Sequence, residues 1–445
     1  KSRVRSRSRW SACRGSASRF WLPLELLGML LTLVAAWTRA GVDQDRPHPG
    51  PAAGGGEGAS AARGYCAALI ALAVVSRLPV FGLPLADDDD WADLSFSRFY
   101  SNPAAGDDEG AFRFLTDQPK RITGCGITAV FFLERLLFDA RAPGYHMVSV
   151  LVFALLAYAI FSLAHRVTGD AGASFLGAAL FLLHPRLWEI TASPSRMDWS
   201  LSALLLLVAL LAFVRFLEGG GRRALLIPLG AGCLAMTLRE VALLVPLILL
   251  AGGVMLVPRE RRRGGILLCL SPLLLASAVT VVHLFGPKLV GGAAAGQPGF
   301  GYLKLASLSG VGGLWELVRT TVIDVPGRVL LPLSWEPRGV AVAGNALALV
   351  LALAGTAAAL LLPPFRRAAF AASVVFMAIT ALPVGMTMAA GGRHDRYLIW
   401  PACFWALLVC VGLASLKRYR AASAAAVALV AVVCFVDGAS RVLAR

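Results

Sequence analysis

Long apolar runs alternate with short polar loops over most of the chain. Each run is about 17 to 25 residues long, the length that crosses a hydrocarbon core of roughly 30 Å as a helix. Apolar and polar positions do not alternate with the period of two that a membrane strand requires. The pattern therefore predicts an all-α polytopic membrane protein with about eleven transmembrane helices from residue 65 onward. The predicted spans are residues 65–85, 147–166, 171–187, 199–217, 223–238, 241–257, 265–287, 339–363, 368–388, 397–416 and 421–438.

Composition and charge agree with this prediction. Of the 445 residues, 58% are hydrophobic and only 15% are charged, and the mean hydropathy of +0.71 exceeds what a soluble domain needs to fill its core. The net charge of +16 lies mostly between the spans, in stretches such as "PRERRRGG" and "LKRYR". Because the positive-inside rule explains this distribution, we expect membrane lipids and no nucleic acid as partners.

Loop charge also predicts the topology. If residue 65 lies on the cytoplasmic side, most loop arginines face the cytoplasm and the acidic stretch 86–121 faces outward. The protein is then expected in the plasma membrane or bacterial inner membrane, with two long outer loops, 86–146 and 288–338. Within these loops, residues 127–140 and 312–325 place apolar side chains at helical spacing between charges. That spacing predicts helices lying in the membrane interface.

The first 64 residues form a separate extension before the predicted transmembrane domain of residues 65–445. Its basic start is followed by "WLPLELLGMLLTLVAA", which is apolar enough to span, and residues 41–64 read as a flexible linker rich in Gly, Ala and Pro. A signal-like segment, an interfacial helix, an additional span and a spurious extension are open alternatives.

Four consecutive aspartates, Asp87, Asp88, Asp89 and Asp90, follow the first predicted span. Adjacent carboxylates raise one another's pKa, so one of these aspartates at the water boundary could act as a general base. Its neighbours could bind a divalent cation. A solvated acidic loop is the alternative. No His or Cys spacing supports a zinc site, so the sequence predicts no required cofactor. A divalent cation bound at the aspartate run is the open alternative.

Three further outer turns carry charged groups beside the membrane, where such groups are costly unless they are paired or functional. They are "HPRLWEITASPSRMDWS", "TLREVALLVP" and "GGRHDRYLIWP". A structural Glu189–Arg196 ion pair and simple helix-end anchors are the alternatives to function. Carboxylates and cations together suit transfer from a phosphate-activated donor, since arginines stabilise charge on a departing phosphate. The candidate residues are His184, Glu189, Arg196, Asp198, Arg239, Glu240, Arg393 and Arg396.

The order of these features resembles the multispanning GT-C glycosyltransferases, which use polyprenyl-phosphate sugars. The resemblance is nearest to the O-mannosyltransferase branch whose eukaryotic members carry tetratricopeptide repeats, and it extends over residues 80–415. Asp89 and Asp90 match that branch's acidic pair after the first span. The other matching stretches are "PGYHMVSVLVFAL" with His146, "HPRLWEITASPSRMD", "LREVALLVPLILL" and "DRYLIWP" with Tyr397.

The resemblance implies a GT-C-like fold with the catalytic base at Asp89 or Asp90 and inversion at the sugar carbon by a single displacement. It places His146, Tyr397 and the charged residues of the three turns around the donor and its phosphate. Two departures matter. No tetratricopeptide array follows, so a protein acceptor is not implied, and the acidic pair is here a run of four, with Asp87 and Asp88 left as candidate cation ligands.

We therefore expect a membrane glycosyltransferase that moves a sugar from a polyprenyl-phosphate donor to a hydroxyl of an acceptor protein, lipid or glycan outside the cytoplasm. A transporter or flippase of an anionic lipid or lipid-linked glycan is the alternative, although the inverted repeat typical of transporters is not visible. A ligase or polymerase of lipid-linked glycans is a third candidate. A scaffold is disfavoured because it would not need costly charges in three turns.

Overall fold

The computed structural model describes residues 55–85, 125–139, 141–219, 222–257, 266–290, 310–330, 364–389 and 395–416, with four single residues near the C-terminus. Every regular element within these ranges is a helix. The chain divides into two compact units, Lys1–Ala67 and Ala68–Arg445. The helices described below belong to the second unit, except the first part of α2.

Helices occupy the predicted spans that lie in the described ranges. The predicted span 339–363 lies outside them, and so does 421–438 apart from the four single residues. The helix α6 begins at Ala142, five residues earlier than the sequence pattern predicts. The helices are α2 (Gly55–Ser76), followed by the 3-10 turn η3 (Leu78–Gly82), α6 (Ala142–Thr168), α7 (Ala171–Leu183), α9 (Met197–Leu217), α10 (Leu226–Leu238), α11 (Val245–Met255), α12 (Ile266–Val290), α16 (Pro364–Ala389) and α17 (Ile399–Ser415).

Within the described ranges, four helical stretches are long and apolar enough to cross a membrane, which makes the chain a multi-pass membrane protein by length and composition. The helices α7, α10 and α11 are shorter than their predicted spans. The helix α7 ends at Leu183 because Pro185 disfavours helical backbone at the preceding residue, His184. The four long stretches are Ala142–Thr168, Pro194–Leu217, Arg366–Ala389 and Asp395–Ser415.

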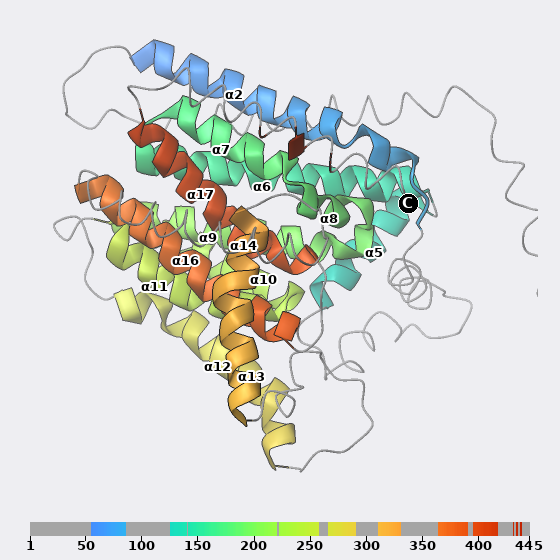
Figure 1. Ribbon diagram of the computed structural model, residues 1–445, viewed down its shortest axis with the longest axis vertical. Helices are drawn as coiled ribbons and strands as arrows, with labels where there is room; N and C mark the ends of the chain where they lie inside the picture. The colour runs from blue at the N-terminus through green and yellow to red at the C-terminus, as the bar shows by residue number, and fades with distance from the viewer. Residues whose placement is uncertain are drawn as a thin grey trace, which may run out of the picture. The chain divides into compact units, whose positions relative to one another are not determined.

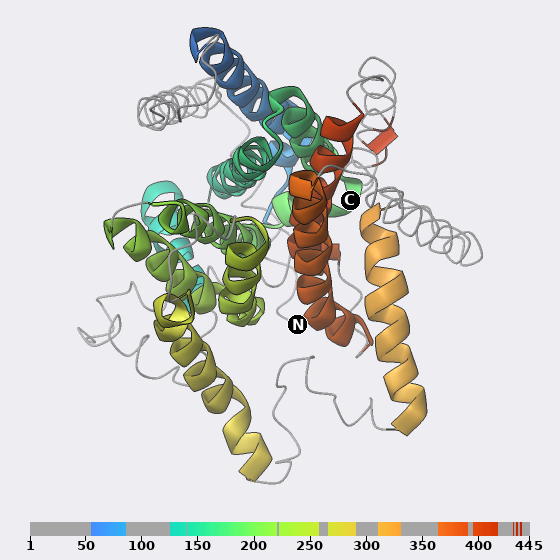
Figure 2. The same ribbon diagram turned by 90° about the vertical axis from the view of Figure 1, so that its left-hand side faces the viewer.

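The helix α17 is central to the packing of the second unit. It lies against α7, α16 and α6, while α9 lies between α6 and α10 (Figures 1 and 2). Close approach of α7 and α17 depends on Gly177, because a Cβ there would lie 3.0 Å from the carbonyl oxygen of Ala406. Small residues let membrane helices approach closely in this way.

Polar contacts join loops that the charge rule assigns to the same side. Arg166, at the end of α6, forms an ion pair with Glu218, which follows α9. At the opposite ends of the helices, Arg186 follows α7 and lies 3.2 Å from Asp395, which precedes α17. The structure therefore groups these loops as the predicted topology does.

The segments predicted to be helical within the two outer loops are helical. In the first loop, α5 spans Cys125–Phe138. In the second, α13 (Gly310–Arg319) continues through a π-helical turn, Thr320–Asp324, into α14 (Val325–Leu330). This second stretch, residues 310–330, packs along α16 (Figure 2), and we call it the docked arm.

The docked arm meets α16 at Gly385, where a Cβ would lie 2.8 Å from the Cα of Thr321. We expect Gly385→Ala to destabilise the docked arm by about 1–3 kcal/mol through this overlap. The matched control is Gly412→Ala on α17, where an added Cβ meets open space. Proteolysis within residues 310–330 should increase in the first variant only. Equal proteolysis of both variants would contradict the close approach.

Candidate functional site

Residues 184–200 form a chain of short helical turns between α7 and α9. The turns are η5 (Pro185–Leu187), α8 (Trp188–Ala192) and η6 (Pro194–Arg196). Proline at the first position starts η5 and η6, since its fixed φ suits a helix start and its missing N–H needs no partner there. The sequence pattern predicted a tight turn at 188–198, but this segment is folded and mostly buried.

Glu189 and Arg196 form an ion pair across this segment. The sequence analysis held such a pair open as a purely structural alternative. His146, on α6, places its Nδ1 3.2 Å from the carbonyl oxygen of Thr191, two residues after Glu189. The structure therefore brings three predicted site residues together around α8.

A second ion pair joins Asp198, in the first turn of α9, to Arg239. Arg239 has extended backbone between α10 and the 3-10 turn η8 (Glu240–Leu244), so the charged pair interrupts the apolar stretch as predicted. The side chain of Asp198 is 1% exposed and that of Arg239 is 27% exposed. The pair thus connects a buried carboxylate to a guanidinium that reaches the protein surface.

Aromatic side chains connect this ion pair to residues 396 and 397 in the C-terminal part of the chain. The Cζ of Arg239 lies 4.7 Å from the centroid of the Trp199 ring, and that ring meets Tyr397 edge to face at 5.0 Å. Tyr397 belongs to the turn η12 (Asp395–Leu398), together with Arg396, whose Cζ lies 5.4 Å from the Tyr397 ring. Arg393 lies outside the described residues.

A charge cluster formed by Arg186, Asp395 and Arg328 was not predicted from the sequence. One oxygen of Asp395, Oδ1, lies 3.2 Å from Nη1 of Arg186 and 3.4 Å from Nη1 of Arg328. Nearby, His184 places its Nε2 3.2 Å from the carbonyl oxygen of Val329. These contacts fix α14 of the docked arm beside the turn before α17. The only sequence signal for this cluster was the presence of charged residues in "HPR", residues 184–186, and "HDR", residues 394–396.

Arg77 is another residue that the sequence analysis missed. This fully buried guanidinium donates from Nη2 to the carbonyl oxygen of Leu182 at 2.6 Å. Its Cζ lies 4.2 Å from the Trp188 ring and 5.1 Å from the Phe153 ring. A lone arginine inside an apolar run was the available signal. Arg77 holds the end of the first predicted span against α8.

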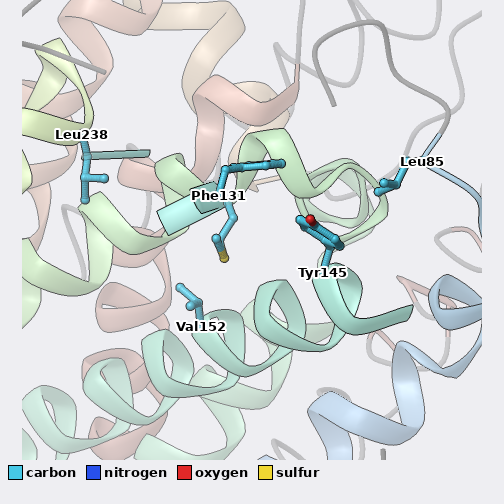
Figure 3. Packing of buried hydrophobic residues seen from close by; sticks show 6 residues of the cluster. Leu85, Phe131, Tyr145, Val152 and Leu238 are labelled. Carbon is cyan, nitrogen blue, oxygen red and sulfur yellow. The ribbon is translucent and has the colours of Figure 1, made fainter. Parts of the chain in front are cut away.

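The end of that span also joins an apolar cluster at the candidate site. Leu85 packs with Phe131 and Tyr145, from the first outer loop and α6 (Figure 3). The same cluster contains Met197, which lies between Arg196 and Asp198, and Leu238, which precedes Arg239. The exit of the first predicted span and residues beside both ion-paired turns therefore contribute to one apolar cluster, in which Figure 3 shows Leu85 and Leu238 at opposite ends.

The predicted catalytic aspartates Asp89 and Asp90, and the candidate cation ligands Asp87 and Asp88, lie outside the described residues. Among the residues that the structure does describe, no group of three or more His, Cys, Asp or Glu side chains is placed to hold a metal ion. The cation hypothesis for the aspartate run stays a prediction.

Chemically, guanidinium groups gathered in partly buried turns suit the binding of a phosphate, because their planar N–H donors match its oxygens. Tyrosine and histidine beside them add hydrogen-bonding groups for a polar ligand. The resemblance to GT-C glycosyltransferases depends on the sequence motifs alone. Comparison with protein-family models, with curated proteins and with solved structures finds no match to this chain.

Proposed function

We propose that the chain is a membrane glycosyltransferase that moves a sugar from a polyprenyl-phosphate donor to a hydroxyl of an acceptor protein, lipid or glycan. The observation that supports this most strongly is the apolar cluster that joins Leu85 to Met197 and Leu238. This cluster connects the end of the first predicted span, through Tyr145 and Phe131, to residues beside Arg196 and Arg239 (Figure 3). A transferase needs this combination, because its base deprotonates the acceptor hydroxyl while its cations stabilise the departing phosphate on the other side of the same anomeric carbon.

The covalent chain supports the same proposal. Asp87 follows Leu85 by two residues and Asp90 follows it by five. Since extended chain covers at most 3.3–3.6 Å per residue, every Cα of the aspartate run lies within about 18 Å of that of Leu85. The aspartate run thus begins two residues after a side chain of the apolar cluster that also contains Met197 and Leu238.

In the proposed reaction, an aspartate of the run accepts the proton of the acceptor hydroxyl. The acceptor oxygen attacks the anomeric carbon as the bond to the phosphate oxygen breaks, which inverts the configuration. Arg196, Arg239 and Arg396 stabilise the negative charge that grows on the departing polyprenyl phosphate. A guanidinium carries five donors, so Arg239 can contact Asp198 and a phosphate at the same time.

The proposal includes the topology. About eleven spans from residue 65 place the aspartate run and the arginine turns on the non-cytoplasmic side of the plasma or inner membrane. The helix α5 and the docked arm lie in the outer interface. On α13, Leu314, Trp315 and Val318 are exposed apolar side chains, as expected for a helix that rests on lipid.

Reconstitution tests the function directly. Purified protein in proteoliposomes is supplied with polyprenyl phosphates that carry radiolabelled mannose, glucose or N-acetylglucosamine, and with acceptor alcohols and glycans. We expect a glycosylated product together with released polyprenyl phosphate. Movement of intact lipid across the bilayer with no cleavage would instead support the transporter or flippase alternative.

A further inference from the structure

The helix α5 has an unusual distribution of side chains. Leu133, Leu136 and Leu137 are 57%, 65% and 75% exposed, whereas Glu134 is 3% exposed. A soluble amphipathic helix would bury its leucines and expose its acid. The leucines are therefore placed to face lipid, and the carboxyl group of Glu134 is directed into the protein.

The inward face of α5 consists of aromatic and apolar groups. Phe131 and Phe138 lie one turn before and one turn after Glu134 on the same side of the helix. Both rings pack on Tyr145, with centroid distances of 5.7 and 6.3 Å. This face belongs to the apolar cluster that contains Leu85, so Glu134 lies beside the candidate site.

Among the residues that the structure describes, neither oxygen of Glu134 has a hydrogen-bond partner. Buried polar groups are normally paired, and an unpaired one indicates a role beyond packing. Burial raises the pKa of Glu134 to about 9, so its carboxyl group is protonated at neutral pH. The titratable and charged groups nearest to it in sequence on α5, and at the adjoining ends of the elements packed against α5, are Arg135, Asp139, Tyr145, His146, Asp198 and Arg239. Tyr158, His165 and Arg166 lie further along α6, Arg215 lies near the end of α9, and Cys233 lies on α10.

We propose that the carboxyl group of Glu134 binds a hydroxyl of the transferred sugar. This inference rests on the proposed function. A neutral carboxylic acid donates one hydrogen bond and accepts another, as a sugar hydroxyl does. Apolar and aromatic walls suit the C–H faces of a sugar, and the arginine turns suit the charged phosphate. Glu134 thus increases the affinity of the protein for the sugar, which is the uncharged part of the donor.

Infrared difference spectroscopy tests the contact without turnover. In detergent at pH 7, the wild-type protein should show a protonated-carboxyl band that is missing in Glu134→Gln and disappears above pH 9. Polyprenyl phosphate that carries mannose, glucose or N-acetylglucosamine should shift this band, while sugar-free polyprenyl phosphate should not. Absence of the band, equal shifts with both lipids, or no shift with any sugar would each overturn the proposal. This result is independent of whether transfer occurs.

Kinetics provide a second test in a transferase assay. Glu134→Leu should raise the KM for the donor about tenfold with little change in kcat, because one or two hydrogen bonds are lost. Glu134→Gln, which still donates and accepts, should raise it only about twofold. Above pH 9 the wild-type KM should rise, since ionised Glu134 no longer donates, and the KM of Glu134→Gln should stay constant.

Stability separates this role from a structural one. Glu134→Leu should unfold at a higher temperature than wild type, because leucine suits the apolar surroundings better than an unpaired acid. Leu137→Ala, on the exposed face of α5, is the control and should change neither donor KM nor its pH dependence. Loss of stability in Glu134→Leu, or equal KM values for the Leu and Gln variants, would contradict sugar binding.

Discussion

Asp89→Asn or Asp90→Asn is expected to abolish glycosyl transfer without reducing the amount of protein in the membrane. A positioned general base contributes roughly 10²–10⁴-fold to a rate, and asparagine keeps the shape of aspartate but cannot accept the proton. The variant with the larger loss identifies the base. Radiolabelled product formed by purified variants in proteoliposomes is the measurement.

Asp93→Asn is the matched control, because Asp93 lies in the same loop but outside the run of four. Its transfer rate should stay near that of wild type. Near-normal transfer by both Asp89→Asn and Asp90→Asn would refute the assignment of the base. Equal losses in all three variants would indicate a general effect of loop charge instead.

Arg239→Met is expected to reduce both stability and donor binding. Asp198 is almost completely buried and forms an ion pair with Arg239, so removal of the cation leaves a buried charge without its partner. Breaking such a pair costs about 3–5 kcal/mol. The double variant Asp198→Asn with Arg239→Met should recover most of this stability but not transfer. Thermal unfolding in detergent and the donor KM separate the two effects.

The control for this pair is Arg319→Met on α13. Arg319 pairs with Glu316, but the two side chains are 45% and 40% exposed, and exposed pairs contribute at most about 1 kcal/mol. This variant should therefore unfold close to the wild-type temperature. If Arg239→Met is no less stable than Arg319→Met, the Asp198–Arg239 pair does not stabilise the fold.

Apolar run length and helix breakers were sufficient to predict the long apolar helices in the described ranges and the break at Arg239, but not the short helix α8. The sequence also indicated the Glu189–Arg196 pair, because the two opposite charges lie only seven positions apart between two predicted spans. The lengths of α7 and α10 were overestimated because hydropathy does not register where an α-helix begins or ends. At α7, the signal was Pro185.

Contacts between distant segments were not predictable. Arg77 contacts a carbonyl 105 residues away, and Asp395 contacts arginines 209 and 67 residues away. Periodicity shows which face of a helix is apolar, but it does not show which other helix covers that face. The burial of Glu134 was missed for the same reason, because the sequence predicted an interfacial helix over residues 127–140 but not which of its faces packs against the protein.

The central claim is that carboxylates of the aspartate run and guanidinium groups of separate turns act on one substrate. Cryo-electron microscopy of the protein with bound polyprenyl phosphate tests it most directly. We predict phosphate density in contact with Arg196, Arg239 or Arg396, and a carboxylate from Asp87–Asp90 beside the same head group. Aspartates that face bulk water, beyond a side chain's reach of each of these arginines, would contradict the account.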